Sequence, residues 1–155
     1  MKYIKTFACL FLFISTSIFA QQYSFESYRM KKYTGPQAKL LIKDNELAQR
    51  YRTTITDTYN SNVRITKWHG KGGINFAGHY CFVYWGCGSD CQHGAIVDVK
   101  TGKVYDGPTA GSLFEYKPWS RLLIVNARNP KNNCAFCKTE YWVLNETTKR
   151  FTQIK

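Results

Sequence analysis

The first regular pattern of apolar and polar positions along the chain is helical. In the segment KDNELAQRYRTTITDTYN, apolar side chains recur every four residues, at Leu47, Tyr51, Ile55 and Tyr59. This spacing places them on one face of an α-helix, and the polar residues that begin the segment can cap its first turn. We predict one amphipathic helix, from about Asn45 to Tyr59, whose apolar face packs on a sheet.

After this segment the pattern changes to a period of two. Short runs rich in β-branched or aromatic residues are separated by turn residues, which is typical of strands. These runs cover residues 63–68, 79–85, 95–99, 103–106, 121–127, 140–144 and 150–154. The simplest arrangement of such a series behind one helix is a meander. We therefore expect an α+β fold in which one N-terminal amphipathic helix packs on an antiparallel β-meander of about six strands.

The segment HYCFVYW, residues 79–85, is largely apolar on both sides when it is drawn as a strand. Alternate residues point to opposite faces of a sheet. One face then carries His79, Cys81, Val83 and Trp85, and the other carries Tyr80, Phe82 and Tyr84. We expect a central strand that is covered on both sides. Within it, Cys81 is expected to be a buried, unpaired small hydrophobe, and His79 a hydrogen-bonded core histidine.

The N-terminal residues, MKYIKTFACLFLFISTSIFAQQ, have the charged, apolar and small-residue order of a secretory signal peptide. We expect residues 1–20 to be removed, residues 21–40 to form an extended N-terminal arm, and residues 41–155 to form a single α+β domain. No second apolar run is long enough to span a membrane, so no span is expected in the mature chain. The expected location is the periplasm or the exterior, and the expected state is a monomer.

The mature chain is strongly basic. Without Lys2 and Lys5, the 22 Lys and Arg residues become 20 against 10 acidic residues, a formal charge of +10. This balance favours an anionic partner, either an envelope component or an acidic protein. The basic residues are scattered, without a long run or a nucleic-acid-binding motif, so no nucleic acid is expected.

The mature chain keeps five cysteines, and an exported chain is expected to form disulfides. In a consecutive meander the loops after the first and fourth strands lie at opposite ends of the sheet. Local bonds, Cys87 to Cys91 and Cys134 to Cys137, would follow. The alternative is that residues 107–120 cross to another sheet layer, so that the two loops meet. A four-cysteine zinc site and a redox role for CAFC fit the compartment and the strands less well, and no metal or cofactor is expected.

The segment GCGSDCQHG contains the residue types of a nucleophilic site. Cys87 could attack, with His79 or His93 as its base and Asp90 or Asp98 as the group that orients the base. A cysteine in a disulfide cannot attack, however, and the glycines indicate a tight loop from Gly86 to Gly94. We therefore expect no catalytic residue here, but a binding surface formed by Trp85, Asp90, Gln92 and His93.

The segment INFAGHYCFVYWGCGSDCQHGAIVDVKTGKVY resembles an uncharacterised family of small secreted bacterial proteins. The resemblance rests on an F-A-G-H-Y strand, a W-G-C-G-x-x-C turn and an I-V-D-x-x-T-G hairpin, and extends to ELAQRYRTTI upstream and SRLLIVN downstream. It implies no activity. Cys81 and the CAFC segment depart from the pattern, which leaves the cysteine pairing open.

Three functions are compatible with these features. The leading one is an exported, non-enzymatic, disulfide-stapled binding or inhibitor module, similar to an immunity protein, that engages an anionic envelope partner or protein. The second is a periplasmic enzyme that uses Cys87 with His79 or His93. The third is a structural envelope protein without a defined ligand.

Overall fold

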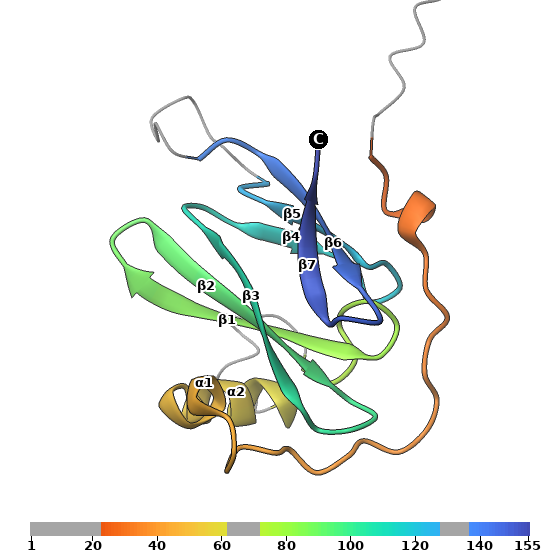
Figure 1. The fold of residues 1–155 in the computed structure, drawn as a ribbon, viewed down its shortest axis with the longest axis vertical. Helices are drawn as coiled ribbons and strands as arrows, with labels where there is room; N and C mark the ends of the chain where they lie inside the picture. The colour runs from red at the N-terminus through yellow and green to blue at the C-terminus, as the bar shows by residue number, and fades with distance from the viewer. Residues whose placement is uncertain (1–22, 62–71, 128–136) are drawn as a thin grey trace, which may run out of the picture.

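The computed structural model describes residues 23–61, 72–127 and 137–155 of the chain (Figure 1). After a 3₁₀ turn at Glu26–Tyr28, the helices are α1 (Glu46–Arg50) and α2 (Arg52–Tyr59). The strands are β1 (Tyr80–Gly88), β2 (Cys91–Asp98), β3 (Val104–Ala110), β4 (Phe114–Tyr116), β5 (Leu122–Val125), β6 (Glu140–Asn145) and β7 (Arg150–Ile154). The predicted strand at 63–68 lies outside the described residues.

The strands form two antiparallel sheets, so the α+β class is confirmed and the single meander is wrong. The first sheet has the order β1-β2-β3, and the second has the order β4-β5-β6-β7. The chain leaves the first sheet after β3 and enters the second through β4, a three-residue strand that pairs with β5 and was not predicted. The connection over residues 107–120 therefore crosses between layers, which was the alternative left open by the sequence.

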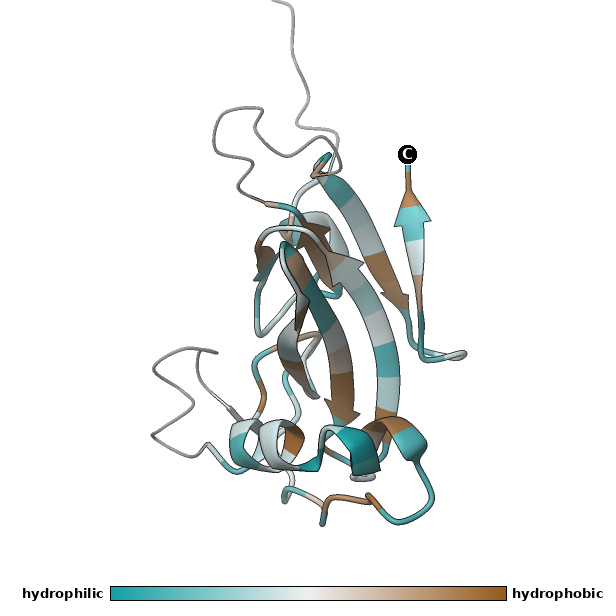
Figure 2. Cartoon of the chain, turned by 90° about the vertical axis from the view of Figure 1, so that its left-hand side faces the viewer, coloured by the Kyte–Doolittle hydropathy of each residue, from teal (hydrophilic) through white to brown (hydrophobic). Residues whose placement is uncertain are grey.

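The three layers enclose two apolar cores. Figure 1 shows α1 and α2 against the lower half of the first sheet, and Figure 2 shows the most hydrophobic segments on the strands and a largely hydrophilic helical surface. The core between the helices and the first sheet includes Ala48, Ile55, Tyr59, Val83 and Val97. The core between the two sheets includes Phe76, Phe82, Ile96, Leu123 and Leu144.

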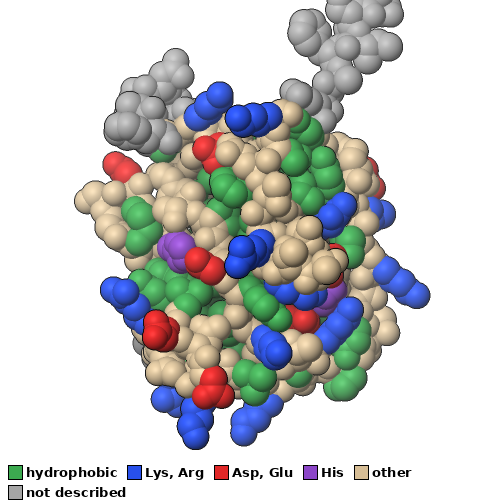
Figure 3. Space-filling view, in the orientation of Figure 1, with side chains coloured by type: hydrophobic (Ala, Val, Ile, Leu, Met, Phe, Trp, Pro, Cys, Tyr) green, Lys and Arg blue, Asp and Glu red, His purple; other side chains and the backbone are tan. Residues whose placement is uncertain are grey.

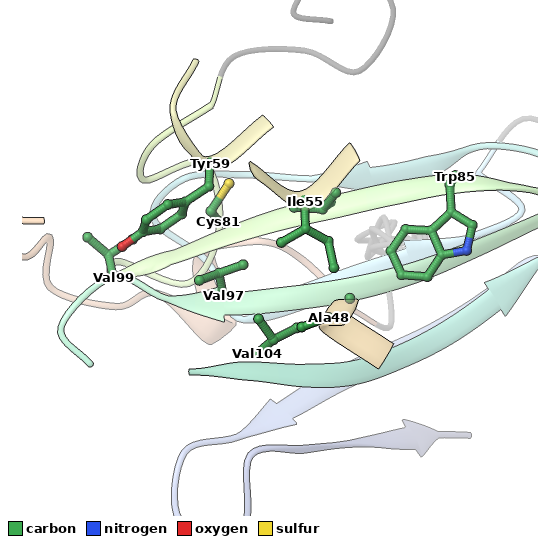
Figure 4. Packing of buried hydrophobic residues seen from close by; sticks show 10 residues of the cluster. Ala48, Ile55, Tyr59, Cys81, Trp85, Val97, Val99 and Val104 are labelled. Atoms are coloured by element: carbon green, nitrogen blue, oxygen red, sulfur yellow. The ribbon is translucent and has the colours of Figure 1, made fainter. Parts of the chain in front are cut away.

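Strand β1 contributes to both cores, as its alternation predicts. Cys81 and Trp85 lie in the helix-side core, where Figure 4 shows them projecting from the same strand, and Phe82 lies in the core between the sheets. The prediction that β1 is a central strand is wrong, because it is an edge of its sheet. The Asn75 side chain occupies that edge, where it accepts a hydrogen bond from the Phe82 N–H and donates one to the Phe82 carbonyl.

The predicted helix is divided at Tyr51 into α1 and α2. Asn45 caps α1, because its side-chain oxygen accepts a hydrogen bond from the Ala48 N–H at 2.9 Å. Tyr51 has φ −111° and ψ 28°, outside the helical region. The following segment, RTTITDTY, is rich in β-branched residues, which have low helix propensity. Helical continuity is therefore weakly favoured, and the break lets the Tyr51 ring stack on Trp85 at 4.1 Å between ring centroids.

The N-terminal arm runs along the edge of the molecule and then beneath the helices (Figure 1). Backbone hydrogen bonds attach it at several points: Met30 N–H to the Trp119 carbonyl, Tyr33 N–H to Gly78, Ala38 N–H to Val99 and Leu41 N–H to Gly102. These bonds are 2.7–2.9 Å long and reach both sheets' connecting segments. The arm is therefore a fixed part of the fold, and its position shapes the surface described below.

Candidate functional site

The hairpin that carries the predicted site is regular almost to its tip. Pairing continues through Trp85 with His93 and Gly86 with Gln92, so the predicted loop over 86–94 is wrong. A glycine is needed at position 94 for a strand reason, since a Cβ there would lie 2.8 Å from the ring of Phe82. The turn itself is only Ser89 and Asp90, and Asp90 adopts φ 51°.

The structure confirms the first predicted disulfide. Cys87 and Cys91 are bonded across the hairpin tip, with their Cα atoms 5.1 Å apart. Cys137 is also disulfide-bonded, but Cys134 lies outside the described residues, so the predicted Cys134–Cys137 pair stays a prediction. Cys81 is free and fully buried, and burial raises the pKa of its thiol to about 12. Its expected role as a small hydrophobe is confirmed.

Trp85 is a core residue and not part of the exposed rim. It is 5% exposed, lies under Tyr51, and has His93 beside it at 5.4 Å between ring centroids. Its indole N–H is buried and has no hydrogen-bond partner among the described residues. Of the residues predicted to bind, Asp90 is exposed at the turn, whereas Gln92 and His93 are half-buried.

His93 ties β2 to β3. Its Nε2 lies 2.7 Å from Asp106 Oδ1, and its Nδ1 lies 2.9 Å from Thr109 Oγ1. Because a carboxylate can only accept, Nε2 donates the hydrogen bond to Asp106, while Nδ1 shares a hydrogen bond with the Thr109 hydroxyl. The group that orients His93 is therefore Asp106, and neither Asp90 nor Asp98 takes that place.

The alternative catalytic pair of Cys87 and His79 is not assembled. The two residues lie at opposite ends of β1, roughly 25 Å apart along a nine-residue strand. His79 is buried beside Glu146, with 3.5 Å between Nε2 and Oε2. Burial, and then the charge of Lys100, lower the pKa of His79 to about 4, so it is a neutral core histidine at pH 7.

A small groove of about 500 Å³ lies beside the disulfide. Its wall is formed by α1 and the hairpin, with the lining residues Glu46, Leu47, Arg50, Tyr51, Cys87, Cys91, His93 and Thr109. The groove therefore contains the predicted disulfide residues Cys87 and Cys91 and the predicted binding residue His93, but its charges are mixed. Arg50 and Glu46 oppose each other in sign, and both nitrogens of His93 are already hydrogen-bonded.

A larger groove of about 1340 Å³, here called the arm groove, lies between residues 37–45, which run from the end of the arm to the start of α1, and the neighbouring α2 and β3. Its apolar lining includes Leu40, Leu41, Ile42, Tyr59 and Val104. Leu41 is 50% exposed, one of two large apolar side chains that are exposed among the described residues. The walls are fixed, because the Tyr59 hydroxyl donates to the Ala38 carbonyl at 2.8 Å and the Asn45 amide donates to the Val104 carbonyl at 2.9 Å.

The arm groove is surrounded by positive charge. Its lining contains Lys39, Lys43, Arg52 and Lys103, and the only acid among the lining residues is Asp44. All four cations are exposed, and none of them takes part in an ion pair within the described residues. Figure 3 shows Lys and Arg side chains spread over the visible face, several of them along the lower edge, where Figure 1 places the arm and helices.

Sequence reasoning did not find the arm groove, because its cations come from three segments that are distant along the chain. One local signal was present. In KLLIKD, Lys39, Leu41 and Lys43 stand at alternate positions, which in an extended segment puts two cations and one apolar side chain on the same side.

Comparisons with protein-family models, curated proteins and solved structures returned no match. The resemblance to the family of small secreted proteins therefore stays a prediction. Within the described ranges, no group of three or more His, Cys, Asp and Glu side chains is arranged to hold a metal ion. In the same ranges, no helix combines the length and apolar character that a membrane span requires.

Proposed function

We propose that the protein is an exported, non-enzymatic binding or inhibitor module that holds an acidic segment of a partner protein in the arm groove. The observation that carries this proposal is the set of four exposed, unpaired cations around a groove with a half-exposed leucine, Leu41. A bound carboxylate-rich segment would supply the missing counter-charges. Such charge complementarity steers association and selects partners of one sign.

The apolar lining favours a protein segment over an anionic polymer. A polymer without apolar groups would neutralise Lys39 and Lys103 but leave Leu41 in water. A segment that carries both acidic and aliphatic side chains satisfies both features, because burying an exposed leucine contributes to binding. The hydrogen bonds that hold the arm to Tyr59 and Val104 preform the groove, which reduces the ordering cost of association.

The state of the cysteine and histidine residues supports a binding role over the enzyme alternative. Cys87 is occupied by its bond to Cys91 and has no thiolate to offer. His93 is held by two hydrogen bonds, and His79 is buried at the far end of β1. The hairpin disulfide also fits export to the periplasm or the exterior, since disulfides persist in oxidising compartments.

The test is a titration of the oxidised mature chain with a short, fluorescently labelled peptide rich in Glu and Leu, followed by anisotropy. We expect saturable binding that weakens as salt is raised, because salt screens the attraction between exposed charges, with a screening length of about 10 Å at 0.1 M that shortens at higher concentration. Lys39→Glu and Lys103→Glu should each weaken binding about tenfold, and Leu41→Ser should weaken it without changing the salt dependence.

Arg150→Glu is the matched control, since it reverses one exposed charge on β7 and lies outside the groove lining. Equal losses in Arg150→Glu and Lys39→Glu would show that only net charge matters, and would overturn the groove assignment. A peptide of Glu alone that binds as tightly as the Glu-Leu peptide would instead favour an anionic polymer. If no anionic probe binds, the structural envelope role becomes the better explanation.

A further inference from the structure

A second charged surface lies on the opposite part of the arm, where aromatic rings and cations alternate. Three cations each lie over a ring: Arg29 over Trp119 at 4.7 Å, Lys117 over Phe25 at 5.3 Å, and Arg121 over Tyr28 at 5.8 Å from the ring centroid. Phe25 and Trp119 also meet edge to face at 6.4 Å. We call these six residues the aromatic ridge.

The backbone holds the two halves of the aromatic ridge in register. The backbones of Arg29 and Ser120 pair in an isolated antiparallel β-bridge. The Met30 N–H donates to the Trp119 carbonyl at 2.7 Å, and the Arg121 N–H donates to the Tyr28 carbonyl at 3.0 Å. The Ser120 hydroxyl adds a bond to the Phe25 carbonyl at 2.8 Å. In Figure 1 the ridge corresponds to the upper part of the arm and the connection from β4 to β5 beside it. The arrangement is therefore built before any partner arrives.

The aromatic ridge has a net positive charge. Its cations face two acids, since Arg29 lies 3.4 Å from Glu26 and Lys117 lies 3.6 Å from Glu115. Both pairs are well exposed and therefore weak. The aromatic ridge thus carries three cations against these two acids, and the exposed residues Lys31 and Lys32 follow on the arm.

We infer that the aromatic ridge docks the protein on the anionic surface of a phospholipid bilayer. Half-buried Trp, Tyr and Phe rings beside Lys and Arg match the interfacial region of a membrane, where rings lie at headgroup depth and cations meet phosphates. The Arg121 guanidinium already donates a hydrogen bond through Nη1 to the Leu144 carbonyl at 3.3 Å. Arg29 and Lys117, whose ion pairs with Glu26 and Glu115 are exposed and weak, are therefore the cations that would meet lipid phosphates. None of the six residues lines either groove, so the surface suits a broad, flat partner better than a peptide chain.

The experiment is co-sedimentation of the oxidised mature chain with vesicles of phosphatidylglycerol mixed with phosphatidylcholine, and with vesicles of phosphatidylcholine alone. Binding is expected only to the anionic vesicles, and raised salt should weaken it. Each cation removed from a membrane-facing patch weakens binding roughly fivefold. Arg29→Gln and Lys117→Gln should therefore each show at least that loss, and Arg29→Glu a larger one.

Two controls separate this inference from the proposed function. Arg150→Gln removes an exposed cation outside the aromatic ridge and should retain most vesicle binding. Lys39→Glu should lose the Glu-Leu peptide but keep the vesicles, whereas Arg29→Glu should do the reverse. An unchanged thermal unfolding midpoint shows that each variant is folded, and if Arg29→Gln is not, Lys117→Gln carries the test.

Several results would overturn the inference. Equal binding to neutral and anionic vesicles would exclude headgroup recognition. Equal losses in Arg29→Gln and Arg150→Gln would show that the aromatic ridge is not the contact. Loss of the acidic peptide, with retained vesicle binding, in the Arg29 and Lys117 variants would make the ridge a protein-binding surface instead.

Discussion

Asn75 closes the open edge of β1, and replacing it tests how this edge is stabilised. Its side-chain oxygen accepts a hydrogen bond from the Phe82 N–H at 2.5 Å, and its amide donates to the Phe82 carbonyl at 3.0 Å. Asn75 is only 6% exposed, so neither backbone group of Phe82 can turn to bulk water. In Asn75→Ala both groups lose this partner in a buried place. Each unmet group costs about 1–3 kcal/mol, so we expect the free energy of unfolding to fall by about 2–6 kcal/mol.

The assay is urea unfolding followed by circular dichroism, in which the midpoint should fall while the slope with denaturant stays constant. Asn75→Asp then tests the hydrogen-bond pattern itself, since it keeps the shape of the side chain and removes the donor. At pH 7 the introduced carboxylate points one oxygen at the Phe82 carbonyl oxygen. Burial and this repulsion raise the pKa of the carboxyl in the folded state above its unfolded value of about 3.9.

The folded Asn75→Asp variant therefore binds more protons than its unfolded chain between the two pKa values. Its stability is expected to be low at neutral pH and to recover as the pH falls through the raised pKa, when the protonated carboxyl can donate to Phe82. Two results would refute the reasoning. One is a loss below about 1 kcal/mol in Asn75→Ala. The other is an Asn75→Asp variant that is as stable as the wild type at pH 7.

Three further predictions concern the hairpin and β1. Gly94→Ala should lower the urea midpoint because its Cβ meets a ring at 2.8 Å, whereas Gly86→Ala, which meets no atom within 4 Å, should not; equal midpoints would contradict this. Replacing Cys87 and Cys91 by alanine opens a short loop, so the free energy of unfolding should fall by about 2 kcal/mol while the circular dichroism spectrum stays unchanged. A variant that is unfolded under native conditions would contradict this prediction. Because burial lowers the pKa of His79 from 6.5 to about 4, the unfolded chain binds more protons than the folded chain between these two pH values. The stability of the wild type should therefore fall as the pH drops from 6.5 to about 4. A His79→Gln variant whose stability changes with pH by the same amount would disprove this.

The local part of the fold could be predicted from the sequence, and the partition of the strands could not. Alternation within β1 assigned Cys81 and Phe82 to opposite faces, and both lie in the expected kind of core. The division into two sheets depends on pairing between β4 and β5, which three residues at Phe114–Tyr116 barely signal. The glycines of the hairpin tip were interpreted as a loop because glycine serves two needs, a positive φ in a turn and close approach of a neighbouring group in a strand. Gly94 meets the second one, close approach to a neighbouring ring.

The candidate site divides along the same line. The local bond between Cys87 and Cys91 was predicted from a single meander, and it forms although the strands divide into two sheets. The burial of Trp85 does not follow from its own segment, because it depends on a helix break at Tyr51 that turns one ring onto the other. The arm groove is harder still to predict from the sequence. Its charges meet only when Lys39, Arg52 and Lys103 are brought together by the arm, α2 and β3.

The position of the arm links the arm groove to a single turn of the first sheet. Gly102, in the turn between β2 and β3, adopts φ 74°, and a side chain there would collide with the backbone oxygen of Lys39. The Gly102 carbonyl in turn accepts the N–H of Leu41. Gly102 therefore serves the turn and also lets the arm pass close enough for the Leu41 N–H to reach its carbonyl. The turn therefore fixes where Lys39 and Leu41 stand relative to Lys103, and with it the spacing of charge and apolar surface that the proposed acidic partner would have to match.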